Sequence, residues 1–158
     1  MKIAVFPGSF DPFTLGHLEI LKSALKIFDK VIVAIGRNAS KNGFFPTEIK
    51  EQIVRDAVRD IPNVEVCTFT GLTVDLCIEK GAEFIVRGMR TTTDFELEKA
   101  IAQANKRMKP SILSVFIPSS HEYAFISSTV VRDVLVNGGN ADAFIPKNVD
   151  IQKYLKMR

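Results

Sequence analysis

This 158-residue sequence has few cysteines and no long apolar segment, and both absences narrow its class. Its two cysteines, Cys67 and Cys77, form no CxxC pair and have no neighbouring histidine. This spacing argues against a metal site or a disulfide, so we expect two reduced thiols in a cytoplasmic protein. No stretch approaches the roughly 20 apolar residues of a membrane span, and the N-terminus lacks the pattern of a signal peptide.

The common fingerprints of nucleotide-binding enzymes are missing as well. Neither GxGxxG nor GxxxxGK[ST] occurs in the chain. These absences argue against a dehydrogenase and against a P-loop kinase. A phosphate site in this protein must therefore be built from other groups.

The composition is that of an ordinary soluble globular protein, with 46% hydrophobic and 25% charged residues. The length is most simply that of one domain over residues 1–158, which is enough for a sizeable core. The formal charge of +3 suits an anionic small molecule and is too diffuse to indicate nucleic acid. We therefore expect a small-molecule protein with no nucleic-acid and no membrane partner.

Short apolar runs rich in Val, Ile and Phe alternate along the chain with amphipathic segments of helical length. The predicted strands are Lys2–Phe6, Lys30–Gly36, Val64–Phe69, Phe84–Arg87 and Ile112–Pro118. The predicted helices are about Leu15–Phe28, Thr47–Asp60, Thr73–Lys80, Asp94–Met108, Ser128–Asn137 and Val149–Lys156. This alternation predicts an α/β fold: a Rossmann-like, doubly wound domain with a central five-stranded parallel sheet and helices on both faces. Ligands of such sheets bind in the loops that follow the strands.

The segment 6–17, FPGSFDPFTLGH, is the loop after the first predicted strand. An apolar run precedes it and apolar residues at helical spacing follow it, so Thr14, Gly16 and His17 lie where a helix begins. Free backbone N–H groups and the positive end of the helix dipole favour a phosphate at this point. A hydroxyl and an imidazole there make a candidate reaction site, although a lone histidine at a helix start is more often a capping or surface group.

Three further loops after predicted strands carry groups that bind phosphate. These groups are Ser40 and Lys41 after the second strand, Arg87 and Arg90 around Gly88 after the fourth, and Ser127, Ser128 and Thr129 before the helix that follows the fifth. Each has a structural alternative, because a lone lysine is usually solvated and a serine at a helix start is a good N-cap. The two arginines could equally form ion pairs with Asp94 and with Glu96 or Glu98.

Taken together, four loops at one end of a sheet present cations, hydroxyls or helix N-termini. This convergence predicts a polyphosphate site. No paired cluster of Asp or Glu stands in these loops, which argues against a tightly held two-metal centre. The pattern leaves room for Mg²⁺ carried in by a nucleotide, since this ion keeps several waters and is held largely by phosphates.

Two motifs resemble those of the nucleotidyltransferase superfamily. The first is PGSFDP followed by Thr14-x-Gly16-His17, and the second is the ISSTxVR run that begins at Ile126. Within the superfamily the chain resembles the phosphopantetheine adenylyltransferases over essentially its whole length, and Thr14 in place of a first histidine is typical of that family. The resemblance implies transfer of the adenylyl group of ATP to 4′-phosphopantetheine, which forms dephospho-coenzyme A and pyrophosphate in coenzyme A biosynthesis.

The resemblance also assigns roles to residues. His17 would stabilise the transition state at the α-phosphate, with Lys41 and Arg90 as further catalytic residues. The implied ATP-binding residues are Ser9, Phe10, His17, Gly88, Met89, Arg90, Glu98, Tyr123, Ala124, Phe125, Ile126, Ser127, Ser128 and Thr129. The implied phosphopantetheine-binding residues are Ser9, Lys41, Thr73 and Arg87. A phosphate contact is implausible for a carboxylate, so we expect Glu98 to orient an arginine or a ribose hydroxyl.

Other expectations follow from the same resemblance. It implies Mg²⁺ with ATP, a homohexamer and feedback binding of coenzyme A. Leu15, Leu97 and Thr73 depart from common family residues, which leaves details of the pantetheine pocket open. The alternatives are another transferase of the superfamily, acting on nicotinamide mononucleotide or using CTP, and a nucleotide-binding module without catalysis.

Overall fold

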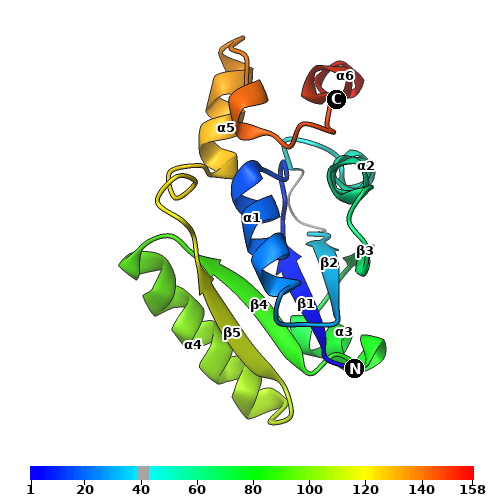
Figure 1. Cartoon of the computed structure of the whole chain (residues 1–158), viewed down its shortest axis with the longest axis vertical. Coiled ribbons are helices and arrows are strands. Elements are labelled where there is room, and N and C mark those ends of the chain that lie inside the picture. Colours follow the sequence, from blue (N-terminus) through cyan, green and yellow to red (C-terminus); the bar gives the residue numbers. More distant parts are fainter. Residues whose placement is uncertain (39–42) are drawn as a thin grey trace.

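The computed structural model describes residues 1–38 and 43–158, and its centre is one parallel sheet of five strands (Figure 1). The strands are β1 (Ile3–Gly8), β2 (Lys30–Gly36), β3 (Val64–Phe69), β4 (Phe84–Met89) and β5 (Leu113–Pro118). Their order is β3-β2-β1-β4-β5, so the chain winds outward from β1 on one side and then returns to build the other side. The switch point of the sheet therefore lies between β1 and β4.

Helices cover both faces of the sheet, as the sequence predicts. They are α1 (Leu15–Ala24), α2 (Thr47–Val58), α3 (Thr73–Lys80), α4 (Thr92–Met108), α5 (Ser128–Val136), the 3₁₀ turn η1 (Asp142–Phe144) and α6 (Ile151–Met157). One apolar core joins the sheet to α1, α2, α5 and α6, and a smaller core joins the opposite face to α3. Helix α4 lies on the same face as α3, where the rings of Phe95 and Phe116 meet edge to face.

The element boundaries agree with the sequence prediction to within two residues, except at the end of α1. Strands β1 and β4 both continue two residues past their predicted ends, to Gly8 and Met89. Helix α1 ends at Ala24 rather than Phe28, because the following amides of Lys26 and Ile27 bond to carbonyls three residues back, as in a 3₁₀ turn. Helix α4 begins before Asp94, because the Thr91 side chain accepts the Asp94 amide and caps the helix. The turn η1 was not predicted.

The sheet opens at the carboxyl ends of its two central strands. Strand β1 pairs with β2 as far as Gly8, but its pairing with β4 is confined to Ala4 and Val5. Beyond that point β4 pairs only with β5, up to Met89. The two strands on either side of the switch point therefore diverge, and this divergence leaves room for a site.

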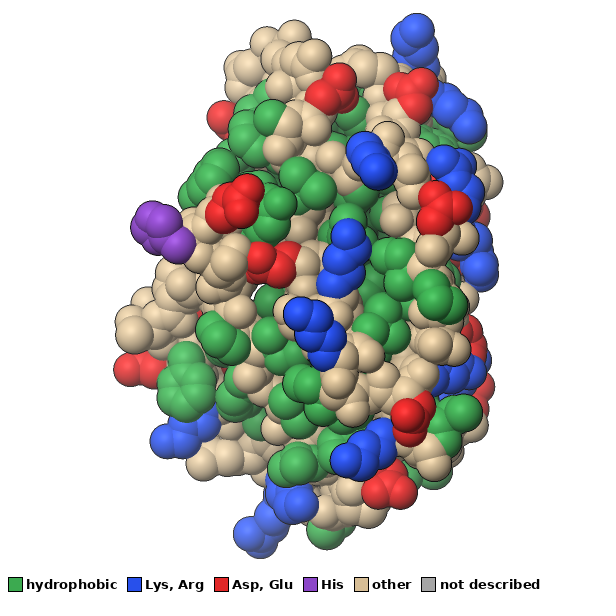
Figure 2. Space-filling model, viewed as in Figure 1, with side chains coloured by type: hydrophobic (Ala, Val, Ile, Leu, Met, Phe, Trp, Pro, Cys, Tyr) green, Lys and Arg blue, Asp and Glu red, His purple; other side chains and the backbone are tan. Residues whose placement is uncertain are grey.

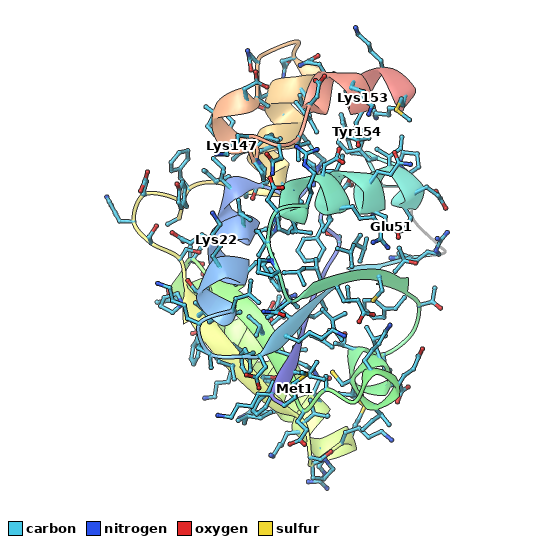
Figure 3. All side chains as sticks on the ribbon, turned by 45° about the vertical axis from the view of Figure 1, so that its right-hand side comes forward. Met1, Lys22, Glu51, Lys147, Lys153 and Tyr154 are labelled. Atoms are coloured by element: carbon cyan, nitrogen blue, oxygen red, sulfur yellow. The ribbon has the colours of Figure 1, made fainter. Side chains whose placement is uncertain are left out.

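Helix α6 returns to the body of the molecule at α2. Figure 3 shows Tyr154 on α6 directed toward α2, where its hydroxyl donates to the Asp56 carboxylate. Burial and this hydrogen bond raise the pKa of Tyr154 to about 12. The contact fixes the C-terminal helix against the last turn of α2.

Helix α4 is the least buried helix of the fold, with no residue in the core. Phe95, Leu97 and Ile101 are exposed on it, and Leu113 is exposed on the neighbouring edge strand β5.

No helix among the described residues is long and apolar enough to cross a membrane. Both cysteines are free. On the face in Figure 2, Lys and Arg side chains are interspersed with Asp and Glu.

Candidate active site

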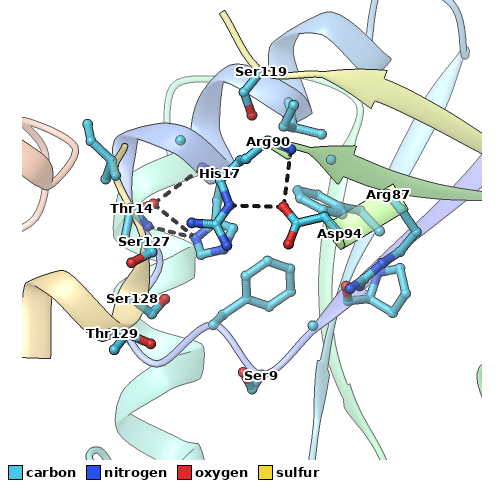
Figure 4. Close-up of a pocket in the computed structure, with 18 of the residues that line it drawn as sticks. Ser9, Thr14, His17, Arg87, Arg90, Asp94, Ser119, Ser127, Ser128 and Thr129 are labelled. Atoms are coloured by element: carbon cyan, nitrogen blue, oxygen red, sulfur yellow. Dashed lines mark hydrogen bonds and ion pairs between the residues drawn. The ribbon is translucent and has the colours of Figure 1, made fainter. Parts of the chain in front are cut away.

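A cavity of about 350 Å³ lies at the open end of the switch point, between the N-terminal ends of α1 and α5. Eleven of the residues predicted for ATP or phosphopantetheine line it: Ser9, Phe10, His17, Arg87, Gly88, Arg90, Glu98, Ile126, Ser127, Ser128 and Thr129. Apart from Glu98, which lies on α4, they come from three of the four regions after strands that the sequence singled out. Figure 4 shows His17, Arg90 and the three hydroxyl residues of α5 around this space.

His17 is held by the first turn of its own helix. Thr14 is the N-cap of α1, and its side chain accepts the backbone N–H of His17 at 3.4 Å. In return the backbone N–H of Thr14 donates to Nδ1 of the His17 ring at 3.0 Å. This is a capping box in which histidine stands where glutamate or glutamine is usual. The TxGH motif therefore fixes the position of the imidazole ring.

The cap also decides where the proton of the imidazole lies. Because Nδ1 accepts from a backbone amide, the neutral ring carries its proton on Nε2. Burial, and then the charges of Arg87 and Arg90, lower the pKa of His17 to about 3. The rings of Phe10 and Phe13 pack against the imidazole, with centroids 5.0 and 5.3 Å away. His17 is thus an uncharged hydrogen-bond donor at neutral pH, and it is no general base.

Arg87 spans the gap between the diverging strands. It projects from β4, and its Nη1 donates to the carbonyl of Pro7 on β1. At Pro7 the backbone pairing between β1 and β4 has already ended. Glu98 on α4 holds the other side of the guanidinium, with Nε–Oε2 and Nη2–Oε1 distances of 3.0 and 2.8 Å. Glu98 therefore orients an arginine, which is one of the two roles expected for it.

Arg90 is held in a similar way by Asp94. The Asp94 carboxylate accepts the Arg90 backbone N–H at 3.2 Å and lies 3.5 Å from its Nε. Each arginine therefore forms the ion pair offered as its structural alternative, and each also lines the cavity. Between them, a Cβ on Gly88 would lie 2.8 Å from Ile20 of α1. The glycine lets the helix that carries His17 approach the strand that carries the arginines.

The N-terminus of α5 forms the opposite wall. Ser127 is the N-cap and accepts the Val130 amide at 3.2 Å, which confirms the predicted cap. The Ser128 hydroxyl donates to the carbonyl of Pro12 at 2.8 Å. Thr129 accepts from Arg132, one helical turn later, at 3.2 Å. Backbone amides, hydroxyls and the helix dipole thus face the same space.

Arg132 is a cavity residue that sequence reasoning missed. Its Nη1 donates to the carbonyl of Asp11 at 2.8 Å, which turns the guanidinium toward the loop after β1. The signal was present, because Arg132 is the last residue of the ISSTxVR motif and stands one turn after Thr129. Asp94 and Ser119 line the cavity too and were not predicted as site residues.

A second cavity, of about 260 Å³, adjoins the first and shares Pro7, Gly8, Arg87 and Glu98 with it. Its other lining residues combine apolar groups with a few polar ones: Gly36, Phe69, Thr73, Ile85, Ile101, Ala102, Asn105, Ser114 and Phe116. Thr73, predicted as a phosphopantetheine residue, therefore belongs to this second cavity. The Arg87–Glu98 pair forms the wall common to both.

Four predicted residues line neither cavity: Met89, Tyr123, Ala124 and Phe125. The last three belong to the loop between β5 and α5, and Phe125 is exposed. Glu19 on α1 anchors the start of this loop by accepting the Ser120 backbone N–H at 2.8 Å. Lys41 lies outside the described residues.

In the described part of the chain, no group of three or more His, Cys, Asp or Glu side chains is placed to hold a metal ion. The two carboxylates of the first cavity, on Asp94 and Glu98, are each engaged by an arginine. A divalent cation in this cavity would accordingly be bound mainly by the phosphates of a ligand.

Comparison with known proteins gives consistent results. The cytidylyltransferase-like family model matches residues 5–134. The chain is 45% identical over 152 residues to phosphopantetheine adenylyltransferase of Flavobacterium psychrophilum, covering 96% of this chain and 100% of the relative. It is 42% identical over 149 residues to phosphopantetheine adenylyltransferase of Lachnoclostridium phytofermentans, covering 94% of this chain and 91% of the relative.

Solved structures support the fold. A bifunctional NMN adenylyltransferase/ADP ribose pyrophosphatase from Francisella tularensis superposes with a TM-score of 0.75 at 20% identity, and the match covers 99% of this chain and 49% of that one. A putative nicotinate-nucleotide adenylyltransferase from Vibrio parahaemolyticus gives a TM-score of 0.70 at 22% identity, covering 92% and 94% of the two chains.

The structure predicts that His17 stays neutral, with its proton on Nε2, over the whole range from pH 5 to pH 8. The measurement is a pH series of long-range ¹H–¹⁵N spectra of the imidazoles, and His121→Gln, at an exposed position, identifies the signals of His17. The pattern should stay that of the Nε2–H tautomer, because the pKa is about 3. A ring that titrates near pH 6.5, or one protonated on Nδ1, would contradict the capping-box geometry.

Proposed function

The chain belongs to the phosphopantetheine adenylyltransferase family, and on that premise we propose how its two cavities perform the reaction. The protein transfers the adenylyl group of ATP to 4′-phosphopantetheine, forming dephospho-coenzyme A and pyrophosphate in coenzyme A biosynthesis. The observation that carries the mechanism is the uncharged Nε2–H donor of His17, held at a helix N-terminus close to Arg87 and Arg90.

ATP occupies the larger cavity in this proposal. Arg90, with the backbone at Gly88 and Met89, holds the phosphates from the side of β4. The N-terminus of α5 holds the β- and γ-phosphates through Ser127, Ser128 and Thr129, with Arg132 added to this set by its position on the wall. The adenine lies at the edge of this cavity in the proposal, where Ile126 lines the wall and the loop residues before it, Tyr123, Ala124 and Phe125, continue outside the cavity. Ser9 and Phe10 form the floor near the α-phosphate. The role of Glu98 toward ATP is indirect, through Arg87.

Phosphopantetheine occupies the second cavity, with its phosphate at the wall shared with the first. Arg87 is the cation on that wall, and its ion pair with Glu98 fixes the guanidinium before substrate arrives. Ser9 and Lys41 complete the phosphate site in the proposal. The pantetheine arm then runs past Thr73 among both apolar and polar side chains, as a chain with amide groups requires.

The chemical step needs no general base, because the nucleophile is already an anionic phosphate oxygen. This oxygen attacks the α-phosphorus of ATP, the bond from that phosphorus to the bridging oxygen of the β-phosphate breaks, and pyrophosphate leaves with the electron pair. The protein brings two anions together and offsets the negative charge with Arg87, Arg90 and Lys41. Nε2–H of His17 donates to an α-phosphate oxygen as charge accumulates there.

Mg²⁺ enters with the nucleotide in this proposal. The engaged carboxylates of the first cavity fit an ion that is held by phosphate oxygens and water. When bound, it neutralises charge on the phosphates and on the departing pyrophosphate.

The geometry also bears on the alternative transferases. Thr14, which replaces the first histidine of the superfamily motif, is 1% exposed and serves as the N-cap of α1. The second cavity combines an arginine wall with a partly apolar lining, which suits a phosphate attached to a flexible arm. A non-catalytic module has no need for a neutral donor fixed at the α-phosphate position.

A pyrophosphate-release assay tests the substrate assignment. With ATP and Mg²⁺, the protein should turn over with 4′-phosphopantetheine and show no turnover above background with nicotinamide mononucleotide. ATP replaced by CTP gives a matched control for the nucleotide. Turnover with nicotinamide mononucleotide alone would overturn the substrate assignment, and no turnover with either acceptor would favour a binding module.

Replacing His17 tests the mechanism. His17→Ala should lower kcat by about two to three orders of magnitude, because a donor to the developing charge at the α-phosphate is lost. ATP binding, measured by calorimetry, should change only a few-fold, since the donor acts mainly in the transition state. His121→Ala, at an exposed position, is the control. Unchanged turnover in His17→Ala would remove the residue from this role.

Assembly is the remaining part of the proposal. The exposed apolar residues of α4 and β5 that line neither cavity, Phe95, Leu97 and Leu113, fit an interface of a homohexamer in the cytoplasm, with coenzyme A as a feedback ligand. Light scattering coupled to size exclusion should give a mass six times that of the chain. Leu97→Glu should lower that mass, whereas Ile27→Glu, at an exposed position after α1 on the opposite face of the sheet, should leave it unchanged. A monomeric wild-type protein would contradict the proposal.

A further inference from the structure

Asp11 is a buried carboxylate for which the reaction scheme has no use. It is 7% exposed and lies in the loop after β1, between Phe10 and the start of α1. Among the described residues no cation is paired with it in a salt bridge, and it lines neither of the two cavities described above. A buried carboxylate that has no ion pair must be stabilised by hydrogen bonds, and the partners in those bonds show which part of the chain it fixes.

The carboxylate of Asp11 binds two successive backbone amides from a distant part of the chain. Its Oδ2 accepts the N–H of Phe44 at 2.7 Å, and its Oδ1 accepts the N–H of Phe45 at 2.9 Å. Phe45 is fully buried, so this segment is itself fixed in the core. Charge-assisted bonds of this kind are short and roughly twice as strong as neutral ones. They anchor the Asp11 side chain through both of its carboxylate oxygens.

The backbone of the same residue faces the phosphate end of the large cavity. The carbonyl of Asp11 accepts Nη1 of Arg132 at 2.8 Å, and the next carbonyl, of Pro12, accepts the Ser128 hydroxyl at 2.8 Å. Arg132 and Ser128 both line the cavity at the N-terminus of α5. Two consecutive carbonyls therefore fix, by hydrogen bonds, two side chains that line the proposed triphosphate site.

We propose that Asp11 is a positioning residue for the triphosphate: its carboxylate fixes the Asp11–Pro12 backbone on Phe44 and Phe45, so that this backbone orients the Arg132 guanidinium toward the β- and γ-phosphates and, by accepting the Ser128 hydroxyl, holds the first turn of α5 beside them. The proposal rests on the proposed function for the identity of the ligand. It adds a residue that touches no substrate, and it explains why an acid stands at this place in the motif.

Gly43 supplies independent support. A Cβ on Gly43 would lie 2.8 Å from Oδ2 of Asp11, closer than side-chain carbons approach an oxygen, and 3.2 Å from the carbonyl of Phe45. The φ of Gly43 is not positive, so the space needed around the carboxylate accounts for the glycine. Gly43→Ala is therefore a second way to displace the Asp11 carboxylate while keeping its charge.

The first test compares the steady-state kinetics of Asp11→Asn with those of the wild type. An asparagine can accept only one of the two amides and presents an N–H₂ to the other. KM for ATP should rise about tenfold while kcat changes less than about threefold, because contacts to the β- and γ-phosphates exist before and during the reaction. A residue that only supported folding would lower the active fraction, and with it kcat, and would leave KM for ATP unchanged.

A double-mutant cycle with Arg132→Ala decides whether Asp11 acts through that arginine. In the Arg132→Ala background, Asp11→Asn should raise KM for ATP by no more than about threefold, because most of the effect has already been lost. An unreduced effect in that background, or an unchanged KM for ATP in folded Asp11→Asn, would overturn the proposal.

Two further variants serve as controls. Arg158 contacts Phe44 from the other side, with its guanidinium 3.7 Å from the ring centroid and its Nε donating to the Phe44 carbonyl at 2.7 Å. Arg158→Ala should leave KM for ATP within twofold, since it does not touch Asp11. Asp29→Asn removes a carboxylate that accepts the Lys2 amide at 2.7 Å, at the other end of the sheet, and should have no effect on kinetics.

If Asp11→Asn does not fold, as judged by circular dichroism, Gly43→Ala carries the test. Its KM for ATP should rise about threefold, and an unchanged KM would overturn the proposal.

If the wild type shows no adenylyl transfer, the proposed function fails separately. The same comparison is then made by calorimetry with α,β-methylene-ATP, whose binding should weaken about tenfold in Asp11→Asn.

Discussion

The hydrogen bond from the Thr14 backbone N–H to Nδ1 of His17 is the interaction on which the site depends. It completes the cap of α1 and occupies one nitrogen of the imidazole, so the other nitrogen must carry the proton. Burial beside the phenylalanine rings, and then the charges of the neighbouring arginines, disfavour a second proton. A local rule of helix initiation thus fixes the charge, the tautomer and the direction of the donor at once.

The sheet provides the setting for that donor. Because β1 and β4 separate beyond Val5 and Ile85, the backbone ladder gives way to a gap at the switch point, and Arg87 bridges it to Pro7. The two cavities meet at this arginine. A reaction that joins two anionic ligands gains from such an arrangement, since one cation lies between the nucleotide and the acceptor and lowers their repulsion.

Much of this could be read from the sequence, because it depends on local patterns. The alternation of apolar runs and amphipathic segments predicts the parallel sheet, and the loops after β1, β4 and β5 carry residues that the structure brings into one cavity. Two features could not be predicted, because they depend on contacts between distant parts of the chain. Arg132 meets the carbonyl of Asp11 across 121 positions, and the divergence of the central strands has no local signal. The sequence allows several partners for Arg87, and the packing of α4 on the sheet selects Glu98 among them.

A structure of the protein with an unreactive ATP analogue and Mg²⁺ tests the central claim most directly, through the distance from Nε2 of His17 to the nearest α-phosphate oxygen. The account predicts a hydrogen bond, with that distance at about 2.7–3.2 Å, Nδ1 still bonded to Thr14, and the β- and γ-phosphates at the N-terminus of α5. An α-phosphate out of reach of Nε2, or a His17 ring turned away from its cap to meet the nucleotide, would contradict it.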